Sequence, residues 1–600
     1  MVETRIIRIP LTAEGLVLES RETLPELHVA YEAYGVLSPA RDNAIYICHA
    51  LTGDAHVAGF HDMHDRKPGW WDAMVGPGKA FDTRRFFVVC ANILGGCMGT
   101  TGPSSINPRT GTPYGSAFPT ITTQDIVKVQ YLLIRELGIK KLAAVVGGSF
   151  GGMQALAWAI QYPDIVETCM CIASAMNLSA QSLAFDIVGR NAILSDPAWN
   201  NGDYYETGKA PAQGLAQARM IGHITYLSSE NMKQKFGREK KEMTKQPHRF
   251  ATPFQVESYL DYQGEKFVNR FDANSYLHIT EAMDHFDLLE GVADPAEAFA
   301  AVAPHTRFLV VALSSDWLFP PEQSIEVARA LIRAGKRVSY CLLKSPYGHD
   351  AFLIEVDHLG EVVRAFLEAS NTPNPAAALV ASSAPDSLPA GAAVLTSAPA
   401  PATGDFDLIG AYIKPKAKVL DLGCGDGELL TELATRRQVN GLGMDIDLSN
   451  IIQVIRRGLE VIQCNLDEGL SVIPDNAYDF AILSQTLQVV HKPRLVLNEM
   501  LRVAQEGIVS FPNFGNWRTR FSLGLKGRMP SSESLPFEWY DTPNIHLATL
   551  HDFIELCRKD GIRIVDTVCI PCGRVDRQLI RLGWSNLGAD RVLVHIARNR

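Results

Sequence analysis

A serine set between glycines, directly after an apolar run, constrains the fold of this chain more than any other feature. The segment Leu142–Met153 reads LAAVVGGSFGGM and matches the pattern G-x-S-x-G through Gly147, Ser149 and Gly151. A sharp turn from strand to helix presents such a serine hydroxyl beyond the sheet, and the flanking glycines relieve crowding in the strained backbone. We therefore predict that Ser149 is a nucleophile. A glycine-rich turn with an incidental serine is the structural alternative.

A serine hydroxyl is a weak nucleophile until a base removes its proton, and in this arrangement an acid and a histidine follow the serine along the chain. Asp316 follows an apolar run in SSDWLFPP, and His349 follows the next β-rich run in SPYGHDAF. We therefore predict a catalytic triad of Ser149, Asp316 and His349. Asp350 is adjacent to His349, and adjacent residues seldom form the orienting hydrogen bond, so Asp350 is left for substrate.

Acyl transfer develops an oxyanion, which two backbone N–H groups usually stabilise. Phe150, directly after the serine, should supply one of them. Leu51, in the segment HALTGDAH after the run Ala44–Cys48, should supply the other. Considered only as structure, the loop around Leu51 is a glycine turn.

Short β-rich runs alternate with helical segments, which is typical of a mostly parallel sheet covered on both faces. Together with the serine turn, this alternation predicts an α/β-hydrolase fold. A long interruption at about residues 177–303 contains helix-like segments, and we interpret it as a helical lid inserted at the C-terminal edge of the sheet. An extra helical layer without substrate contact is the alternative. The expected strands include Ala44–Cys48, Phe86–Ala91, Leu142–Val146, Arg307–Leu313 and Val338–Leu343.

A stretch rich in proline and alanine divides the chain, whose 600 residues exceed what one hydrophobic core usually supports. Residues 371–404 hold six prolines and eleven alanines, and Asp386 is their only charge. Such a composition buries too little area to offset the entropy of ordering it, so we expect a semi-extended linker. The predicted domains are residues 1–370 and 405–600.

Composition argues against several classes of partner. The formal net charge of -10 gives no broad attraction for phosphate backbones or anionic membranes. No apolar segment reaches membrane-spanning length, and the N-terminal sequence MVETRIIRIP lacks the apolar stretch of a secretory signal. The eleven cysteines are scattered and odd in number, which fits free thiols in a reducing compartment. We therefore expect a soluble cytoplasmic protein that binds neither nucleic acid nor membrane.

Two short motifs resemble metal-ligand spacing. Cys569 and Cys572 form a C-x-x-C pair, but a tetrahedral zinc site needs a second pair or histidines at matching spacing, and none follows. The run HDMHD lacks a third convergent ligand, so we expect a solvated loop there and no bound metal. The residues of that run that could bind a metal are His61, Asp62, His64 and Asp65.

Over roughly residues 5–367 the chain resembles the homoserine O-acetyltransferases of methionine biosynthesis. The resemblance implies that acetyl-CoA acetylates Ser149, that CoA leaves, and that the hydroxyl of homoserine then takes the acetyl group, without a cofactor. It also implies a homodimer formed through the lid helices. The matching blocks are HALTGDAH, GWWDAMVGPGKAFDT, NILGGCMGTTGPSSINP, GGSFGGMQAL, ARMIGHITY, SSDWLFPP and GHDAF.

In that family an arginine and the aspartate after the catalytic histidine bind the amino acid, and Arg219 and Asp350 occupy these positions here. A guanidinium suits the homoserine carboxylate and a carboxylate suits its ammonium. Arg219 as an ordinary salt-bridge residue of the lid is the structural alternative.

Three other functions compete with homoserine acetylation. Succinyl-using relatives carry an arginine two residues after the catalytic aspartate, whereas this chain has Leu318, which favours acetyl-CoA over a homoserine O-succinyltransferase activity. A serine hydrolase or esterase with a fused methyltransferase is the main alternative. A noncatalytic scaffold is disfavoured because all three triad members follow strands in the expected order.

The second domain begins with a glycine-rich loop after the predicted strand Lys418–Leu422, in the segment DLGCGDGELL. The pattern D-x-G-x-G-x-G is typical of S-adenosylmethionine sites and predicts a Rossmann-like domain of the methyltransferase type. We expect Asp445 to bind the ribose hydroxyls and Asp467 to contact the adenine. A merely structural turn is the alternative. The pattern consists of Asp421, Gly423, Gly425 and Gly427.

Over residues 406–592 the chain is similar to the MetW methyltransferase-like proteins, through VLDLGCGDGELL, LSQTLQVV, IVSFPNFGNW and FEWYDTPNIH. The N/D-P-P-Y/F motif of amino methyltransferases is missing, since SFPNFG has a single proline. The sequence therefore predicts a cofactor site for S-adenosylmethionine but indicates no methyl acceptor. A regulatory or stabilising module for the first domain competes with an enzyme.

Overall fold

The computed structural model describes residues 1–240, 254–369, 405–531 and 534–599. The chain divides into two units, Met1–Leu367 and Glu368–Arg600. The predicted linker at residues 371–404 lies outside the described residues. None of the described helices combines the length and the apolar character that a membrane crossing requires.

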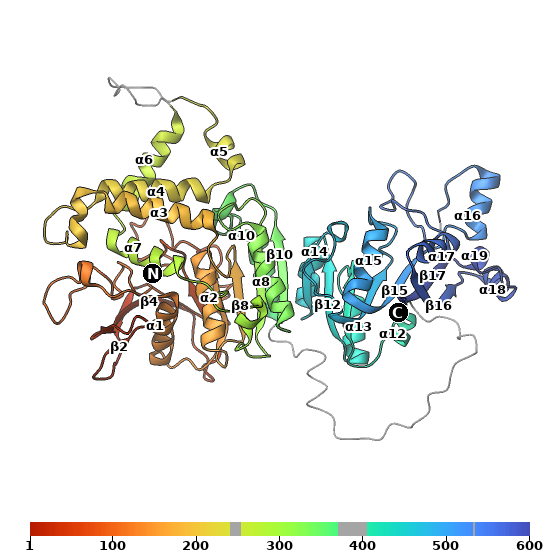
Figure 1. Cartoon of the computed structure of the whole chain (residues 1–600), viewed down its shortest axis with the longest axis horizontal. Helices are drawn as coiled ribbons and strands as arrows, with labels where there is room; N and C mark the ends of the chain where they lie inside the picture. Colours follow the sequence, from red (N-terminus) through yellow and green to blue (C-terminus); the bar gives the residue numbers. More distant parts are fainter. Residues whose placement is uncertain (241–253, 370–404, 532–533, 600) are drawn as a thin grey trace, which may run out of the picture. The chain divides into compact units, whose positions relative to one another are not determined.

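A central sheet organises the N-terminal unit, with strands in the order β1, β4, β6, β5, β7, β8, β9 and β10 (Figure 1). The strands from β6 to β10 are parallel, and β4 and β1 extend one edge in antiparallel pairing. Strands β5, β8 and β9 are buried along their whole length, as their continuous apolar sequences require. The bounds are β1 Arg5–Arg8, β4 His28–Tyr34, β5 Ala44–Cys48, β6 Phe87–Ala91, β7 Leu142–Gly148, β8 Thr168–Ile172, β9 Arg307–Leu313 and β10 Arg337–Leu343; the short pair β2 Leu16–Val17 and β3 Thr23–Leu24 forms a separate ribbon.

Helices lie between the successive parallel strands from β6 to β10. Helix α2 (Phe150–Gln161) packs on β5, β7 and β8, and α8 (Pro321–Arg333) packs on β9 and β10. Helix α1 (Thr123–Glu136) packs on α2 and begins with a capping box formed by Thr122 and Asp125. The unit ends with α9 (Ala351–Ile354) and α10 (Val356–Ala369).

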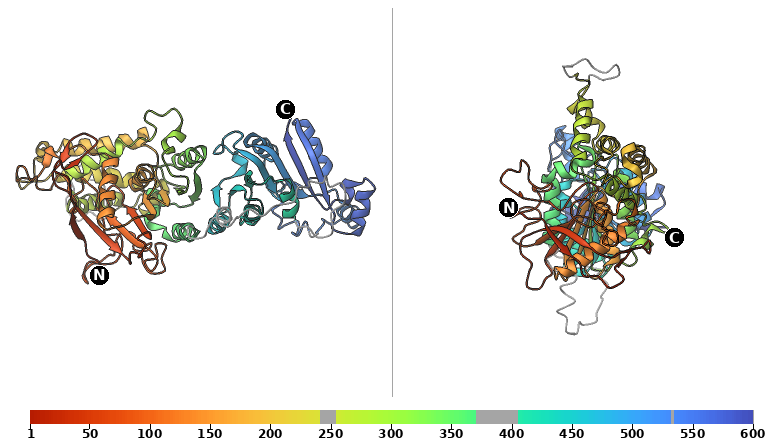
Figure 2. Two further views of the ribbon diagram at one scale, coloured as in Figure 1. Left: turned by 90° about the horizontal axis from the view of Figure 1, so that it is seen from below. Right: turned by 90° about the vertical axis from the view of Figure 1, so that its left-hand side faces the viewer.

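A group of helices between β8 and β9 occupies the stretch where the sequence predicts an insertion (Figure 1, amber to yellow-green). Helix α4 packs against both α3 and α6, and the end-on view shows α6 projecting from this layer (Figure 2). The layer contacts the loop that follows β9, because Ser182 Oγ donates to Leu318 O at 3.0 Å and Trp317 Nε1 donates to Leu227 O at 3.0 Å. Helix α4 also packs on the short turn Gly348–Asp350 after β10. The helices therefore lie at the C-terminal edge of the sheet. Their bounds are α3 Ala180–Leu194, α4 Ala212–Tyr226, α5 Ser229–Lys235, α6 Gln255–Val268 and α7 Ala273–Asp284.

The C-terminal unit is built on a second sheet, in the order β13, β12, β11, β14, β15, β17 and β16 (Figure 1). Strands β13 to β15 are parallel, and β17 pairs antiparallel with both β15 and β16. Helices α13, α14 and α15 join β11 to β12, β12 to β13 and β14 to β15, as parallel pairing favours, and a short 3-10 turn lies between β13 and β14. The strands are β11 Lys418–Leu422, β12 Asn440–Asp445, β13 Glu460–Gln463, β14 Tyr478–Ser484, β15 Ala504–Pro512, β16 Ile562–Ile570 and β17 Arg591–Arg598; the helices are α12 Asp405–Tyr412, α13 Glu428–Arg437, α14 Leu448–Arg456, α15 Pro493–Val503, α16 Trp517–Phe521, α17 Leu550–Lys559, α18 Arg574–Arg581 and α19 Ser585–Gly588.

Candidate active site

The turn from β7 to α2 holds Ser149 in a strained conformation. Strand β7 ends at Gly148, α2 begins at Phe150, and Ser149 between them has φ 60° and ψ -129°. Such backbone angles are costly for a residue with a side chain and persist only where the surroundings enforce them. A side chain at Gly147 or at Gly151 would overlap the carbonyl oxygen of Gly151 or of Cys48, respectively. The glycines are therefore required by the close packing of the protein's own backbone.

Asp316 and His349 lie in the loops after β9 and β10 and are hydrogen-bonded to each other. His349 Nδ1 is 2.6 Å from Asp316 Oδ2, and both side chains are buried. The other carboxylate oxygen of Asp316 accepts the backbone N–H groups of Leu318 at 3.0 Å and Phe319 at 2.9 Å. The carboxylate is thus fixed from both sides, and it fixes the orientation of the imidazole.

The second nitrogen of His349 is available for chemistry. Nε2 is buried and has no hydrogen-bond partner among the described residues. Burial lowers the pKa of His349, but the negative charges of Asp316 and Asp350 outweigh that effect, so the pKa lies above its ordinary value. An imidazole arranged in this way can accept a proton at Nε2 and share the resulting charge with Asp316.

The serine turn and the histidine loop are packed together through Phe352. A Cβ added to Gly148 would lie 2.6 Å from the Phe352 ring, whose centroid lies 5.7 Å from that of His349. Because β7, β9 and β10 run parallel in one sheet, their C-terminal ends bring Ser149, Asp316 and His349 to the same edge.

Leu51 and Phe150 present backbone N–H groups at this edge. Phe150 is the first residue of α2, so its N–H has no partner within the helix. Leu51 is a central residue of a turn closed by the hydrogen bond from Gly53 N to Ala50 O, which leaves the Leu51 N–H out of the turn. Cys48 and Gly147 are register partners of β5 and β7, so the two segments are neighbours.

Arg219 lies on α4, which packs beside the turn that carries His349 and Asp350. Its Nη1 donates to Thr52 Oγ1 at 3.0 Å, and its guanidinium lies 4.8 Å from the centroid of the Phe267 ring. No ion pair of Arg219 is present within the described residues. These neighbours therefore leave the positive charge of Arg219 without a permanent counter-ion.

Asp350 is half-buried, and burial raises its pKa above the usual range, with the charges of His349, Arg219 and Lys235 offsetting part of the effect. A carboxylate in this position gains from a cation brought by a ligand.

Arg270 is a further candidate residue of the site, and the sequence analysis did not identify it. Its Nη2 donates to Thr52 O at 2.9 Å, and its Nη1 lies 3.5 Å from Asp54 Oδ2. It thus contacts the same residue of the Leu51 loop as Arg219 does. No spacing in the sequence marks it, because the contact joins segments more than two hundred residues apart.

In the C-terminal unit the glycine loop follows β11 and faces the end of β12. Asp445 Oδ2 accepts the N–H of Gly425 at 2.9 Å, and Asp445 Oδ1 accepts that of Asp447 at 2.9 Å. Burial, followed by the charge of Asp445, raises the pKa of Asp421 to about 7. Gly423, Gly425 and Gly427 all have positive φ, with values of 74°, 55° and 80°.

Asp467 lies elsewhere in that unit, in the short turn after β13. Its carboxylate oxygens accept the backbone N–H groups of His491 at 3.1 Å and Lys492 at 2.7 Å. The carboxylate thus holds the segment before α15, and only its remaining lone pairs are free for a ligand.

Two family descriptions match the chain, one for each unit. The alpha/beta hydrolase fold matches residues 43–356, and Methionine biosynthesis protein MetW matches residues 403–595. A relative from Rhodopirellula baltica, named Bifunctional methionine biosynthesis protein MetXA/MetW, is 41% identical over 568 residues, which cover 92% of this chain and 87% of that protein. The chain belongs to the bifunctional MetXA/MetW family. The α/β-hydrolase fold predicted from the serine turn and the resemblance of the second domain to MetW are thereby confirmed.

Relatives of the MetXA part alone include both a transferase and an esterase. The homoserine O-acetyltransferase of Methanohalobium evestigatum is 52% identical over 366 residues, which cover 61% of this chain and 73% of that protein. The solved structure of esterase E22 is 30% identical, with a TM-score of 0.56, and covers 61% of this chain and 100% of that one. The fold alone therefore does not separate acyl transfer to an alcohol from acyl transfer to water.

Proposed function

We propose that the N-terminal unit transfers the acetyl group of acetyl-CoA to the hydroxyl of L-homoserine, giving O-acetyl-L-homoserine for methionine biosynthesis. The observation that carries the proposal is the buried, hydrogen-bonded pair of Asp316 and His349, whose Nε2 has no partner within the described residues. Helix α4, which carries Arg219, packs against the turn of His349. The identity to the homoserine O-acetyltransferase of Methanohalobium evestigatum supports the same substrates.

The reaction proceeds in two halves through Ser149. His349 Nε2 takes the proton of the Ser149 hydroxyl as Oγ attacks the thioester carbonyl of acetyl-CoA. The N–H groups of Leu51 and Phe150 stabilise the oxyanion of the tetrahedral intermediate. The carbon–sulfur bond then breaks, CoA leaves with the proton from His349, and an acetyl ester of Ser149 remains.

The second half repeats the chemistry with homoserine in place of CoA. His349 takes the proton of the homoserine hydroxyl, whose oxygen attacks the acetyl ester, and the proton then returns to Ser149 Oγ as the product leaves. Arg219 binds the homoserine carboxylate and Asp350 its ammonium, which aims the hydroxyl at the ester carbon. The half-burial of Asp350 favours such a cation, because an ammonium there stabilises the ionised carboxylate.

The helices between β8 and β9 act as a lid, the role we assign to residues 177–303. An acyl enzyme that meets water hydrolyses, so a transferase must keep water out while homoserine binds. The same helices are the surface through which we propose that the chain forms a homodimer. Esterase activity is the second candidate function, favoured by the similarity to esterase E22.

Acetyl-CoA is the proposed donor because of Leu318. This residue lies two positions after Asp316, and its backbone N–H donates to the Asp316 carboxylate. Its apolar side chain offers no partner for the additional carboxylate of a succinyl group.

We propose that the C-terminal unit, residues 405–600, is a Rossmann-like domain of the methyltransferase type that binds S-adenosylmethionine. From β11 the sheet grows through β12 and β13 on one side and through β14 and β15 on the other, so the strand order reverses at β11. Ligands of open α/β sheets bind at such a switch point. The loop from Gly423 to Gly427 would hold the cofactor at its backbone, Asp445 would bind the ribose and Asp467 the adenine side. No methyl acceptor follows from these residues, and a regulatory role for this unit competes with a catalytic one.

Release of CoA from acetyl-CoA by the whole chain, measured with and without homoserine, tests the function. The proposal predicts rapid release only with homoserine, and slower release when succinyl-CoA replaces acetyl-CoA. Equal release without homoserine would identify a hydrolase, and a preference for succinyl-CoA would overturn the donor.

A further inference from the structure

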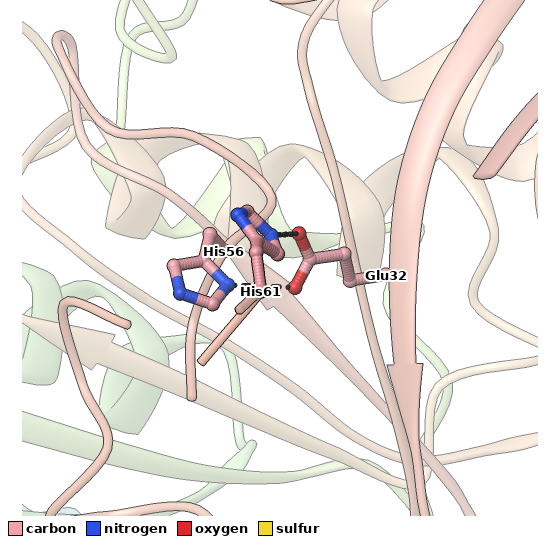
Figure 3. A group of neighbouring side chains, drawn as sticks. All are labelled: Glu32, His56 and His61. Carbon is pink, nitrogen blue, oxygen red and sulfur yellow. Dashed lines mark hydrogen bonds and ion pairs between the residues drawn. The ribbon is translucent and has the colours of Figure 1, made fainter. Parts of the chain in front are cut away.

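Three side chains from the N-terminal unit converge at a point that the acyl-transfer chemistry does not use (Figure 3). Glu32 lies on β4, and His56 and His61 lie in the segment that follows the Leu51 loop. Glu32 Oε2 is 3.0 Å from His56 Nδ1, and Glu32 Oε1 is 2.7 Å from His61 Nε2. The three ligand atoms all lie within 4.8 Å of one another.

The grouping of the three ligand atoms within 4.8 Å is compatible with the first coordination shell of a small divalent cation. Metal–ligand bonds of about 2.0–2.1 Å in a tetrahedral arrangement place neighbouring ligand atoms roughly 3.3 Å apart. The distances of 3.0 Å and 2.7 Å run to the two different oxygens of Glu32 and are somewhat shorter than this spacing, so the side chains need to open only slightly to admit an ion. Two imidazoles and a carboxylate are also a ligand set that zinc adopts in proteins, with a further position for a water or hydroxyl.

The buried negative charge of Glu32 also favours a cation at this point. Its side chain is fully buried, and the ion pairs it forms within the described ranges are those with His56 and His61. The other donors to its carboxylate are the neutral hydroxyls of Thr4 at 2.8 Å and Tyr34 at 2.7 Å. A buried carboxylate without a permanent cation is costly, and a metal ion would supply the missing charge.

The surroundings hold the ligands in place. The Tyr34 hydroxyl, which donates to Glu32, accepts the backbone N–H groups of Val57 at 3.0 Å and Ala58 at 3.1 Å. Asp65 Oδ2 accepts the N–H of His61 at 2.7 Å. The Tyr34 hydroxyl thus fixes the carboxylate, as outer partners do in known metal sites, while Asp65 fixes the backbone at His61. The exposed edge of His61 provides a route for an ion from solvent.

We propose that Glu32, His56 and His61 bind a divalent transition-metal ion, Zn²⁺ by the chemistry of the ligands. The ion ties the end of the segment 49–56, which carries Leu51, to strand β4. Its fourth ligand is a water or the Thr4 hydroxyl. The sequence alone predicts a solvated loop without a metal at the run HDMHD, and the proposal departs from that expectation. Of the run only His61 is a ligand, and the other two ligands, Glu32 and His56, lie outside it. The proposal does not depend on the acetyltransferase activity.

The test uses the whole chain, freed of metal by a chelator and dialysed. Zinc is then titrated into the metal-free protein, and the bound zinc is measured by elemental mass spectrometry. The absorption bands of Co²⁺, added in place of zinc, are a second readout. The ligand variants are His61→Ala, which changes an exposed side chain, and Glu32→Gln. The matched controls are His64→Ala, in the same loop, and Cys572→Ser, which removes an exposed thiol.

The wild-type chain should bind one equivalent of zinc. Both ligand variants should bind zinc at least about tenfold more weakly, because even substitution of a residue that only supports a ligand lowers metal affinity by that factor. Both controls should bind as the wild type does. Zinc should also raise the melting temperature of the wild type but not of His61→Ala. The proposal is overturned if the wild type binds no more zinc than His61→Ala does, or if either control loses the metal.

Discussion

The two units each place a glycine-rich turn at the end of a parallel strand, but the glycines serve different needs. Around Ser149, side chains at Gly147 and Gly151 would overlap backbone oxygens of the protein itself. At Gly425, no atom lies within 4 Å of the position that a Cβ would take. The first turn is closed by the protein's own backbone, whereas the second is open at Gly425, although Cβ atoms at Gly423 and Gly427 would meet the side chains of Thr486 and Val454.

The polar groups around the two turns also differ. Near Ser149, an imidazole and a carboxylate are hydrogen-bonded in a chain that can move a proton. Near Gly425, the Asp445 carboxylate accepts backbone N–H groups, and no histidine hydrogen bond to Asp445 is present in the described part of the chain. The comparison teaches that a glycine pattern locates a site, while the side chains beside it decide between covalent chemistry and binding.

The largest effect is expected from Ser149→Ala. Removal of the nucleophile should lower the turnover of acetyl-CoA by at least about 10⁴-fold. Asp421→Asn, at the second turn, should leave acetyl transfer unchanged. Steady-state assays of both variants check the contrast, and a large loss in Asp421→Asn would show that the two sites are not chemically separate.

Arg219→Ala should separate the two halves of the reaction. Loss of the charged hydrogen bonds to the homoserine carboxylate should lower kcat/KM for homoserine by roughly 10²-fold. Acetylation of Ser149 needs no homoserine and should change little, which single-turnover release of CoA would measure. If both halves fall equally, Arg219 supports the site in general and does not bind homoserine.

Alanine at the two kinds of glycine should affect stability and ligand binding to different extents. Gly151→Ala should cost about 2–3 kcal/mol in the free energy of unfolding of its unit, because a Cβ there overlaps Cys48 O. Gly425→Ala should cost about 1–2 kcal/mol, from its positive φ alone, yet abolish binding of S-adenosylmethionine. Thermal unfolding and calorimetric titration measure the two effects. Unchanged cofactor binding in Gly425→Ala would remove the basis of the comparison.

The smallest effect concerns pH. The base form of His349 is lost as the pH falls through its pKa, and that pKa lies above the ordinary value because of Asp316 and Asp350. Asp350→Asn removes one of the two charges, so the acidic limb of Ser149 acetylation should move to lower pH, by a few tenths to about one unit. The pH profile of single-turnover CoA release tests the shift. A limb that stays in place or rises would show that Asp350 does not act on His349.

Local patterns could predict the Ser149 turn and the α/β-hydrolase fold, because a strand, a glycine turn and a helix are consecutive in sequence. Chain order alone was enough to pair Asp316 with His349, and the two side chains are hydrogen-bonded, although their catalytic roles stay predictions. The carboxylate of Asp467 holds backbone N–H groups, which no sequence motif indicates.

Contacts between distant segments could not be predicted in this way. Glu32 meets His56 and His61 because β4 pairs with β6, and the loop that leads from β5 to β6 brings the two histidines to β4. The motif HDMHD drew attention to His61, but its partners lie outside the motif. Arg270 likewise reaches Thr52 across more than two hundred residues.

The most direct test of the acyl-enzyme account is peptide mass spectrometry of the chain after brief exposure to acetyl-CoA. The account predicts an acetyl group on the peptide that contains Ser149, its removal when homoserine is added, and its absence in Ser149→Ala. An unmodified Ser149 peptide during turnover, or an acetyl group that homoserine does not remove, would contradict it.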